Sequence, residues 1–214
     1  KGTTWEGGHR VRLLLRCPGV IKPGTQINEM VAHNDWLPTF LAAAGEPTVR
    51  EKLLKGYKVG NKTFKVRLDG YNLLPFLKGE TKTTPREEYL FFDQGGNLNA
   101  LRWHEWKINF AVLQGNIATG MRVTPAWPVI VNLHADPFER APHESVMYWR
   151  WYGDLMWLFV PVQQKLKEFF ADFMKYPYQI GSSLTVSNIN YQTLRMAEAM
   201  KRLNQVEELH PPRN

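Results

Sequence analysis

Cysteine is almost absent from this sequence, which contains Cys17 alone. One cysteine cannot form a disulfide within the chain, and it cannot build a zinc site that needs several thiolates. Long apolar runs are also missing, and the longest lies within DLMWLFVPV, which is too short to cross a bilayer. The sequence therefore predicts neither an intrachain disulfide nor a membrane span.

Basic residues are numerous but not clustered. The formal net charge is +7, yet no long run of lysine and arginine occurs. The densest basic stretch, KLLKGYKVGNKTFKVR, is typical of a solvated loop and a strand edge. Nucleic-acid-binding surfaces need such charges gathered on one face, so we predict no nucleic-acid partner.

Metal-binding and nucleotide-binding spacings are missing too. Although His33, His134 and His143 each lie near an acidic residue, none has the His-x-x-x-His spacing that places two imidazoles on one helix face. We expect His33 and His134 in turns. No Gly-x-Gly-x-x-Gly motif or phosphate-binding loop is present either.

The sequence does contain enough apolar residues to form a hydrophobic core. Of its 214 residues, 43% are hydrophobic and 13% are aromatic. Its first part has an α/β pattern. VRLLL (Val11–Leu15) predicts a strand buried on both faces, and a helix should follow with Asn34 or Asp35 as its N-cap and Gly45 at its end.

From about residue 46 the pattern changes to antiparallel strands and a helix. EYLFFD predicts a strand, ALRWHEWKINFAVL a strand or hairpin with one buried and one wetter face, and WPVIVNLHADPFE a strand that ends in a turn. PVQQKLKEFFADFMKYP predicts an amphipathic helix, and YQTLRMAEAMKRLNQ a weaker one. We therefore predict a boundary between residues 1–45, the end of an α/β domain, and residues 46–214, a subdomain with a helical tail.

Several motifs together resemble one enzyme family. KGTTWEGGHRVR resembles the sulfatase signature of Lys-Gly, two threonines, an aromatic residue and Glu-Gly-Gly. PGVIKPGT, NDWLPTFLAAAG, DGYNLLPFLKG and LRWHEWKINF resemble later segments of that family in order and spacing. The resemblance covers roughly residues 1–140 and implies the C-terminal part of an arylsulfatase-like enzyme.

This resemblance implies an α/β fold, namely the C-terminal part of an alkaline-phosphatase-like sandwich with a small antiparallel-sheet-plus-helix subdomain. It also implies a formylglycine nucleophile and a Ca²⁺ ion. Neither is expected to be held by this chain, because Cys17 is followed by Pro18 and has Ile21 where the family motif needs arginine. We expect Cys17 to be a small buried residue, and an upstream part of the same enzyme to supply the nucleophile and the metal ligands.

The resemblance also assigns candidate site residues. Lys1 matches the lysine that holds a sulfate oxygen, and a fixed ammonium stabilises the charge that develops when sulfur is attacked. Glu6 and Arg10 are expected to hold the turn that follows. His9 is a candidate for lining the substrate pocket.

The hairpin turn DQGGNLN is a second candidate for substrate contact, through Asp93 and Asn97. An ordinary glycine-rich hairpin turn remains an alternative for this segment. For the whole chain the predicted partner is a small sulfate ester. A phosphonate or phosphate monoester hydrolase on the same scaffold, or a non-catalytic binding module, remains the alternative.

Overall fold

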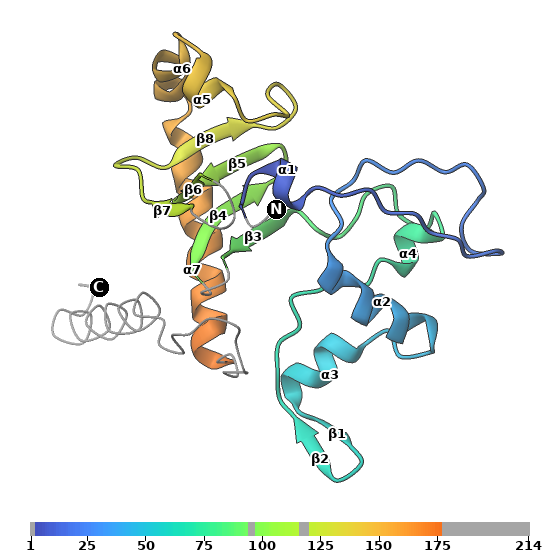
Figure 1. Cartoon of the computed structure of the whole chain (residues 1–214). Helices are drawn as coiled ribbons and strands as arrows, with labels where there is room; N and C mark the ends of the chain where they lie inside the picture. Colours follow the sequence, from blue (N-terminus) through green and yellow to red (C-terminus); the bar gives the residue numbers. More distant parts are fainter. Residues whose placement is uncertain (1–2, 94–96, 116–119, 177–214) are drawn as a thin grey trace, which may run out of the picture.

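The centre of the molecule is a four-stranded antiparallel sheet. The computed structural model describes residues 3–93, 97–115 and 120–176 (Figure 1). Within these residues the strand order is β3-β4-β5-β8. The strands are β3 (Glu88–Phe92), β4 (Leu98–Trp103), β5 (Trp106–Asn109) and β8 (Val129–Asn132). The predicted hairpin at WHEW is confirmed, since β4 and β5 pair up to Trp103 and Trp106.

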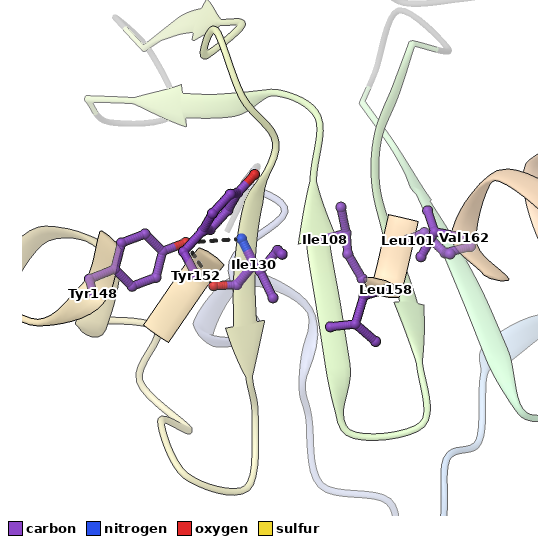
Figure 2. Packing of buried hydrophobic residues seen from close by; sticks show 7 residues of the cluster. All are labelled: Leu101, Ile108, Ile130, Tyr148, Tyr152, Leu158 and Val162. Carbon is purple, nitrogen blue, oxygen red and sulfur yellow. Dashed lines mark hydrogen bonds between the residues drawn. The ribbon is translucent and has the colours of Figure 1, made fainter. Parts of the chain in front are cut away.

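One face of this sheet carries the hydrophobic core. Leu101, Ile108 and Ile130 lie side by side on the three consecutive strands β4, β5 and β8, because their register pairs them across the ladder. Side chains from the C-terminal helices cover them, namely Tyr148 and Tyr152 of α6 (Tyr148–Asp154), Leu158 of η2 (Met156–Leu158) and Val162 of α7 (Phe159–Lys175) (Figure 2). The predicted packed helix is α7, and the small antiparallel sheet with its helix is confirmed.

The opposite face of the sheet is not wet, which corrects the prediction for this strand. Lys107 and Asn109 alternate with the core residues of β5, yet both are 0% exposed. The reason lies far away in the sequence, because the N-terminal turn with the short helix α1 (Glu6–His9) contacts this face through Lys107 and Phe91. A period-two pattern cannot reveal that a second layer covers the polar side.

The remaining strands form two separate hairpins. β1 (Tyr57–Val59) pairs with β2 (Lys62–Phe64), and β6 (Val112–Gln114) pairs with β7 (Met121–Val123). The short helix α5 (Ala141–Glu144) follows β8. This mixture of helices and antiparallel strands fits the predicted α/β class.

A group of short helices lies beside the sheet (Figure 1). It comprises η1 (His33–Asp35), α2 (Trp36–Ala43), α3 (Val49–Lys55) and α4 (Leu74–Leu77). α2 ends where predicted, since Gly45 has a φ of +97° that a residue with a side chain rarely adopts. α3 lies in a stretch predicted as loop, and good helix formers (VREKLLK) with a Lys52–Glu46 ion pair explain it.

Asp35 fastens this helical group to the start of the sheet. It occupies the N-cap position of α2, but its buried carboxylate serves other partners. It accepts hydrogen bonds from the Tyr71 amide at 2.8 Å and from Arg86 Nε at 2.9 Å. Thr39, four residues on, accepts a bond from the Leu73 amide at 2.9 Å. The Asp-x-x-Pro-Thr sequence thus ties α2 to the segment that leads into α4.

The predicted strand at Val11–Leu15 does not form. These residues have no regular structure, and Leu14 is 95% exposed. A strand needs a neighbour for its backbone groups, and no described residue pairs with this segment. Cys17 is also exposed rather than buried, because it opens a turn in which the Ile21 amide donates to its carbonyl at 2.9 Å.

Two further predictions concern larger parts of the chain. α2 and α3 contact each other across residues 45 and 46, and the boundary there stays a prediction. The predicted helix within YQTLRMAEAMKRLNQ lies outside the described residues. In the described part of the chain, no helix is both long and apolar enough to cross a bilayer.

Candidate functional site

The turn after the N-terminal lysine is a tight backbone structure. The Gly8 amide donates to the Trp5 carbonyl at 2.8 Å, and the Arg10 amide donates to the Glu6 carbonyl at 2.7 Å. Gly8 also approaches Thr3, whose carbonyl oxygen would lie 2.7 Å from a Cβ placed at residue 8. Gly8, the second glycine of the motif, therefore permits a close backbone contact that alanine would prevent. Lys1 itself lies outside the described residues.

Lys107 anchors this turn from beneath. Its ammonium lies 2.8 Å from Glu139 Oε1 and 3.4 Å from Glu6 Oε1, and it donates a hydrogen bond to the Thr4 carbonyl. It also lies 4.7 Å from the centre of the Phe91 ring, a favourable cation–π distance. A fully buried lysine is stable only when it is paired in this way.

Glu139, which lies 133 residues after Glu6 in the sequence, completes the anchor. Its Oε2 accepts the Glu6 amide at 2.5 Å, so it binds both the turn and Lys107. Its backbone has a φ of +55°, which is uncommon for a residue with a side chain. Burial raises the pKa of Glu139, while the Lys107 charge acts in the opposite direction. Asp136 fixes the preceding turn by accepting the Ala141 amide at 2.7 Å.

Glu6 and Arg10 were predicted to hold the turn, and the Glu6 side chain contacts other described residues. It is buried, and Arg102 lies 3.6 Å from its second carboxylate oxygen. Burial lowers the pKa of Arg102, and the Glu6 charge opposes that effect. The Arg10 side chain is exposed and makes no ion pair with a described residue. Its predicted role in holding the turn stays a prediction.

His9 lies against the sheet beside this anchor. Its ring meets Phe91 edge to face, with 5.0 Å between the ring centres. Burial lowers the pKa of His9 below its usual value, and the Lys107 charge adds to the effect. The imidazole is consequently neutral over more of the physiological pH range than a free histidine would be.

Asp93 and Asn97 meet across the β3–β4 turn. The Asn97 amide donates to Asp93 Oδ1 at 2.9 Å, and its side-chain nitrogen lies 2.9 Å from Oδ2. Arg122 Nε lies 3.6 Å from the same carboxylate and donates to Asn99 Oδ1 at 2.8 Å. β3 carries Phe91, which contacts His9, and Asp93 directly follows the end of this strand.

Sequence reasoning missed Lys107 and Glu139 as members of this site. Lys107 lies in LRWHEWKINF, one of the segments that resemble the sulfatases, and Glu139 is the last residue of the predicted strand and turn WPVIVNLHADPFE. The available signal was a lysine inside a strand of apolar residues, which needs a buried counter-charge. The pairing itself spans too much sequence to be read from spacing.

The described residues do not form a metal site. No group of three or more histidine, cysteine, aspartate or glutamate side chains in the described ranges could hold a metal ion. Cys17 lies in an exposed turn with Ile21 in place of the required arginine. The Ca²⁺ ion and the formylglycine that the family implies therefore do not fit the residues described here.

Comparison with known proteins identifies the class. No protein-family model matches the sequence. Human steryl-sulfatase is 30% identical over 162 residues, which cover 66% of this chain and 25% of that protein. Human arylsulfatase A is 32% identical over 154 residues, covering 65% of this chain and 27% of that protein. The chain is therefore a relative of the sulfatases, which confirms the predicted resemblance.

More specifically, the chain is similar to the C-terminal portion of these enzymes. It spans about a quarter of the length of the relatives it matches. The structure of the PsFucS1 sulfatase from Pseudoalteromonas sp. aligns with 53% of this chain and 23% of its own, with a TM-score of 0.43 and 26% identity.

Proposed function

We propose that this chain contributes the sulfate-binding part of an arylsulfatase-like enzyme that hydrolyses sulfate esters to an alcohol or phenol and sulfate. Lys1 would hold a sulfate oxygen. The relationship to sulfatases supports the reaction class. The observation that carries the proposal is the buried anchoring of the turn that directly follows Lys1, through Lys107 and Glu139.

The chemistry explains why such a lysine would be useful. Attack at the sulfur atom places negative charge on the sulfate oxygens and on the departing alkoxide. An ammonium group held at a fixed position stabilises that charge without reorganising, and the effect is larger where water is excluded. The nucleophile and the metal ligands would come from an upstream part of the same enzyme, since the described residues hold neither.

His9, Asp93 and Asn97 would contact the organic part of the ester. A neutral imidazole beside Phe91 suits an uncharged or aromatic group, and the lowered pKa of His9 favours that state. Asp93 and Asn97 are hydrogen-bonded to each other, so these two residues would be preorganised for such a contact.

The test is reconstitution of activity. This chain is combined with an upstream sulfatase segment whose formylglycine is verified by mass spectrometry, and hydrolysis of p-nitrophenyl sulfate is measured. We expect activity that Lys1→Ala lowers by at least 100-fold. The control is Lys22→Ala, which removes an exposed lysine in a later turn, at residues 22–25, and should retain full activity.

The other outcomes refute the proposal in different ways. Absence of hydrolysis in a complex whose assembly is verified would favour a non-catalytic binding module. Faster hydrolysis of p-nitrophenyl phosphate than of the sulfate would assign the scaffold to phosphate monoesters. Equal activities of the Lys1→Ala variant and the parent chain would remove Lys1 from the site.

A further inference from the structure

The buried charges around Lys107 lie apart from the main core. The sheet is stabilised on its other face by Leu101, Ile108 and Ile130 with the C-terminal helices (Figure 2). Lys107 lies on the opposite face and forms no part of that cluster. Its buried charge needs a reason other than packing, because burying a lysine and its partners costs desolvation energy that apolar side chains would avoid.

The charged contacts of this group converge on one short segment. Lys107 reaches the Thr4 carbonyl and the Glu6 carboxylate, while Glu139 reaches the Glu6 amide. Arg102 approaches Glu6 from the neighbouring strand. Two cations and two carboxylates thus balance one another, and the backbone that they fix is the one directly after Lys1.

We propose that Lys107 and Glu139 are positioning residues for Lys1, holding residues 4–6 so that the ammonium of residue 1 stays at the sulfate. This inference rests on the proposed function. Neither side chain touches the substrate, since Lys107 is fully buried and Glu139 nearly so. They act through the Thr4 carbonyl, the Glu6 amide and the Glu6 carboxylate. Thr4 and Glu6 lie three and five residues after Lys1 in the sequence.

The expected kinetic signature follows from this geometry. A misplacement of about 1 Å in a group that stabilises the transition state lowers the rate about 100-fold, whereas substrate binding depends on other contacts. Loss of the anchor should therefore reduce kcat far more than it raises KM. A residue that served only global stability would leave both constants of the folded protein unchanged.

Two variants remove the ion pair between Lys107 and Glu139 and are chosen so that the chain still folds. Glu139→Gln keeps the acceptor for the Glu6 amide but removes the charge next to Lys107. The double variant Lys107→Met/Glu139→Leu replaces the pair with apolar side chains, a change that buried ion pairs often tolerate. The matched control is Lys165→Met, which removes an ion pair between α7 and Glu88 of the same sheet but does not touch the turn.

The first measurement uses the 214-residue chain alone and needs no activity. Amide hydrogen exchange is followed in residues 4–10 and in strands β4, β5 and β8. We expect the double variant to exchange at least tenfold faster in residues 4–10, with unchanged strands, and Lys165→Met to leave residues 4–10 as in the parent chain. Equal protection of the turn in the double variant and the parent would overturn the proposal.

The second measurement uses the reconstituted enzyme and a double-mutant cycle with Lys1→Ala. If the anchor acts through Lys1, the double variant lowers kcat about 100-fold in the parent but has little further effect when Lys1 is already alanine. Additive losses would refute a positioning role. If the parent complex shows no hydrolysis, the proposed function fails and with it the role for Lys1, while hydrogen exchange still decides whether the anchor holds the turn.

Discussion

Replacing Tyr148 with phenylalanine should reveal how the open edge of the sheet is protected. The Tyr148 hydroxyl donates to the Ile130 carbonyl at 2.9 Å and accepts the Ile130 amide at 3.0 Å (Figure 2). Ile130 lies on β8, which has a partner strand on one side only. One phenol therefore satisfies both backbone groups of an edge residue that is itself fully buried.

The magnitude follows from these two bonds. Phenylalanine keeps the ring in the core but leaves a buried N–H and a buried C=O of Ile130 without partners. Each unsatisfied buried group costs about 1–3 kcal/mol, so the loss of both bonds in Tyr148→Phe should lower the free energy of unfolding by about 2–6 kcal/mol. Tyr152→Phe is the matched control, because that hydroxyl makes one bond, to the Pro128 carbonyl at 2.9 Å, and its loss should cost about 1 kcal/mol.

Urea unfolding followed by tryptophan fluorescence measures both variants. With a slope of about 2 kcal/mol/M, Tyr148→Phe should shift the midpoint down by about 1–3 M and Tyr152→Phe by about 0.5 M. If Tyr148→Phe is no more destabilising than Tyr152→Phe, the two bonds to Ile130 contribute nothing to stability, and the reasoning is wrong.

The pH dependence gives an independent check. Burial raises the pKa of Tyr148 from its usual 10 to about 12, although the bond with Ile130 acts the other way. The folded state thus favours the neutral phenol. This contribution is complete below pH 10 and is lost as the pH rises to about 12, a change of about 2–3 kcal/mol. The difference in stability between the parent and Tyr148→Phe should shrink over that interval.

Three further changes test other parts of the structure. Gly70→Ala should destabilise the chain by more than about 2 kcal/mol in urea unfolding, because a Cβ there would lie 1.9 Å from the Asn34 carbonyl oxygen; a neutral effect would contradict this packing. NMR titration should give His9 a pKa below its usual value, and Phe91→Leu should not restore it, since burial is the main cause and the Lys107 charge the second. The favourable contribution of neutral His9 is complete above its unfolded pKa and is lost as the pH falls through its lower folded pKa, so a pKa above about 6.5 would refute the assignment. Leu14→Lys should change the free energy of unfolding by less than about 0.5 kcal/mol and improve solubility at high concentration in light scattering, because Leu14 is exposed; marked destabilisation would mean that the side chain is packed.

The sequence predicted correctly those elements that depend on residues close to one another in the chain. The helix after Asp35 ends at Gly45 because the backbone there needs positive φ, and the sequence carries the glycine. The β4–β5 hairpin was visible because alternating apolar residues on both sides of WHEW are close in sequence. The strand expected at Val11–Leu15 failed because apolar character alone cannot supply the neighbouring strand that backbone hydrogen bonds require.

The candidate site was predictable only in part, because its contacts are long-range. Glu6 was expected to hold its turn from the motif, and the structure gives it Lys107 and Arg102 as partners. Nothing near Lys107 in the sequence indicates that residues 4–6 would cover it. Alternation predicted a wet face there, and a turn from the other end of the chain made that face dry.

The hydrogen bond between the Glu6 amide and Glu139 also has a consequence for biosynthesis. The two residues are 133 positions apart. The ribosome synthesises residues 3–10 first, and at about 5–20 residues per second Glu139 follows about 7–27 seconds later. The turn that carries the sulfatase-like motif therefore cannot reach its final geometry until residue 139 has been translated. Premature termination before that residue yields a polypeptide in which the turn lacks Glu139, even when every residue of the motif is present.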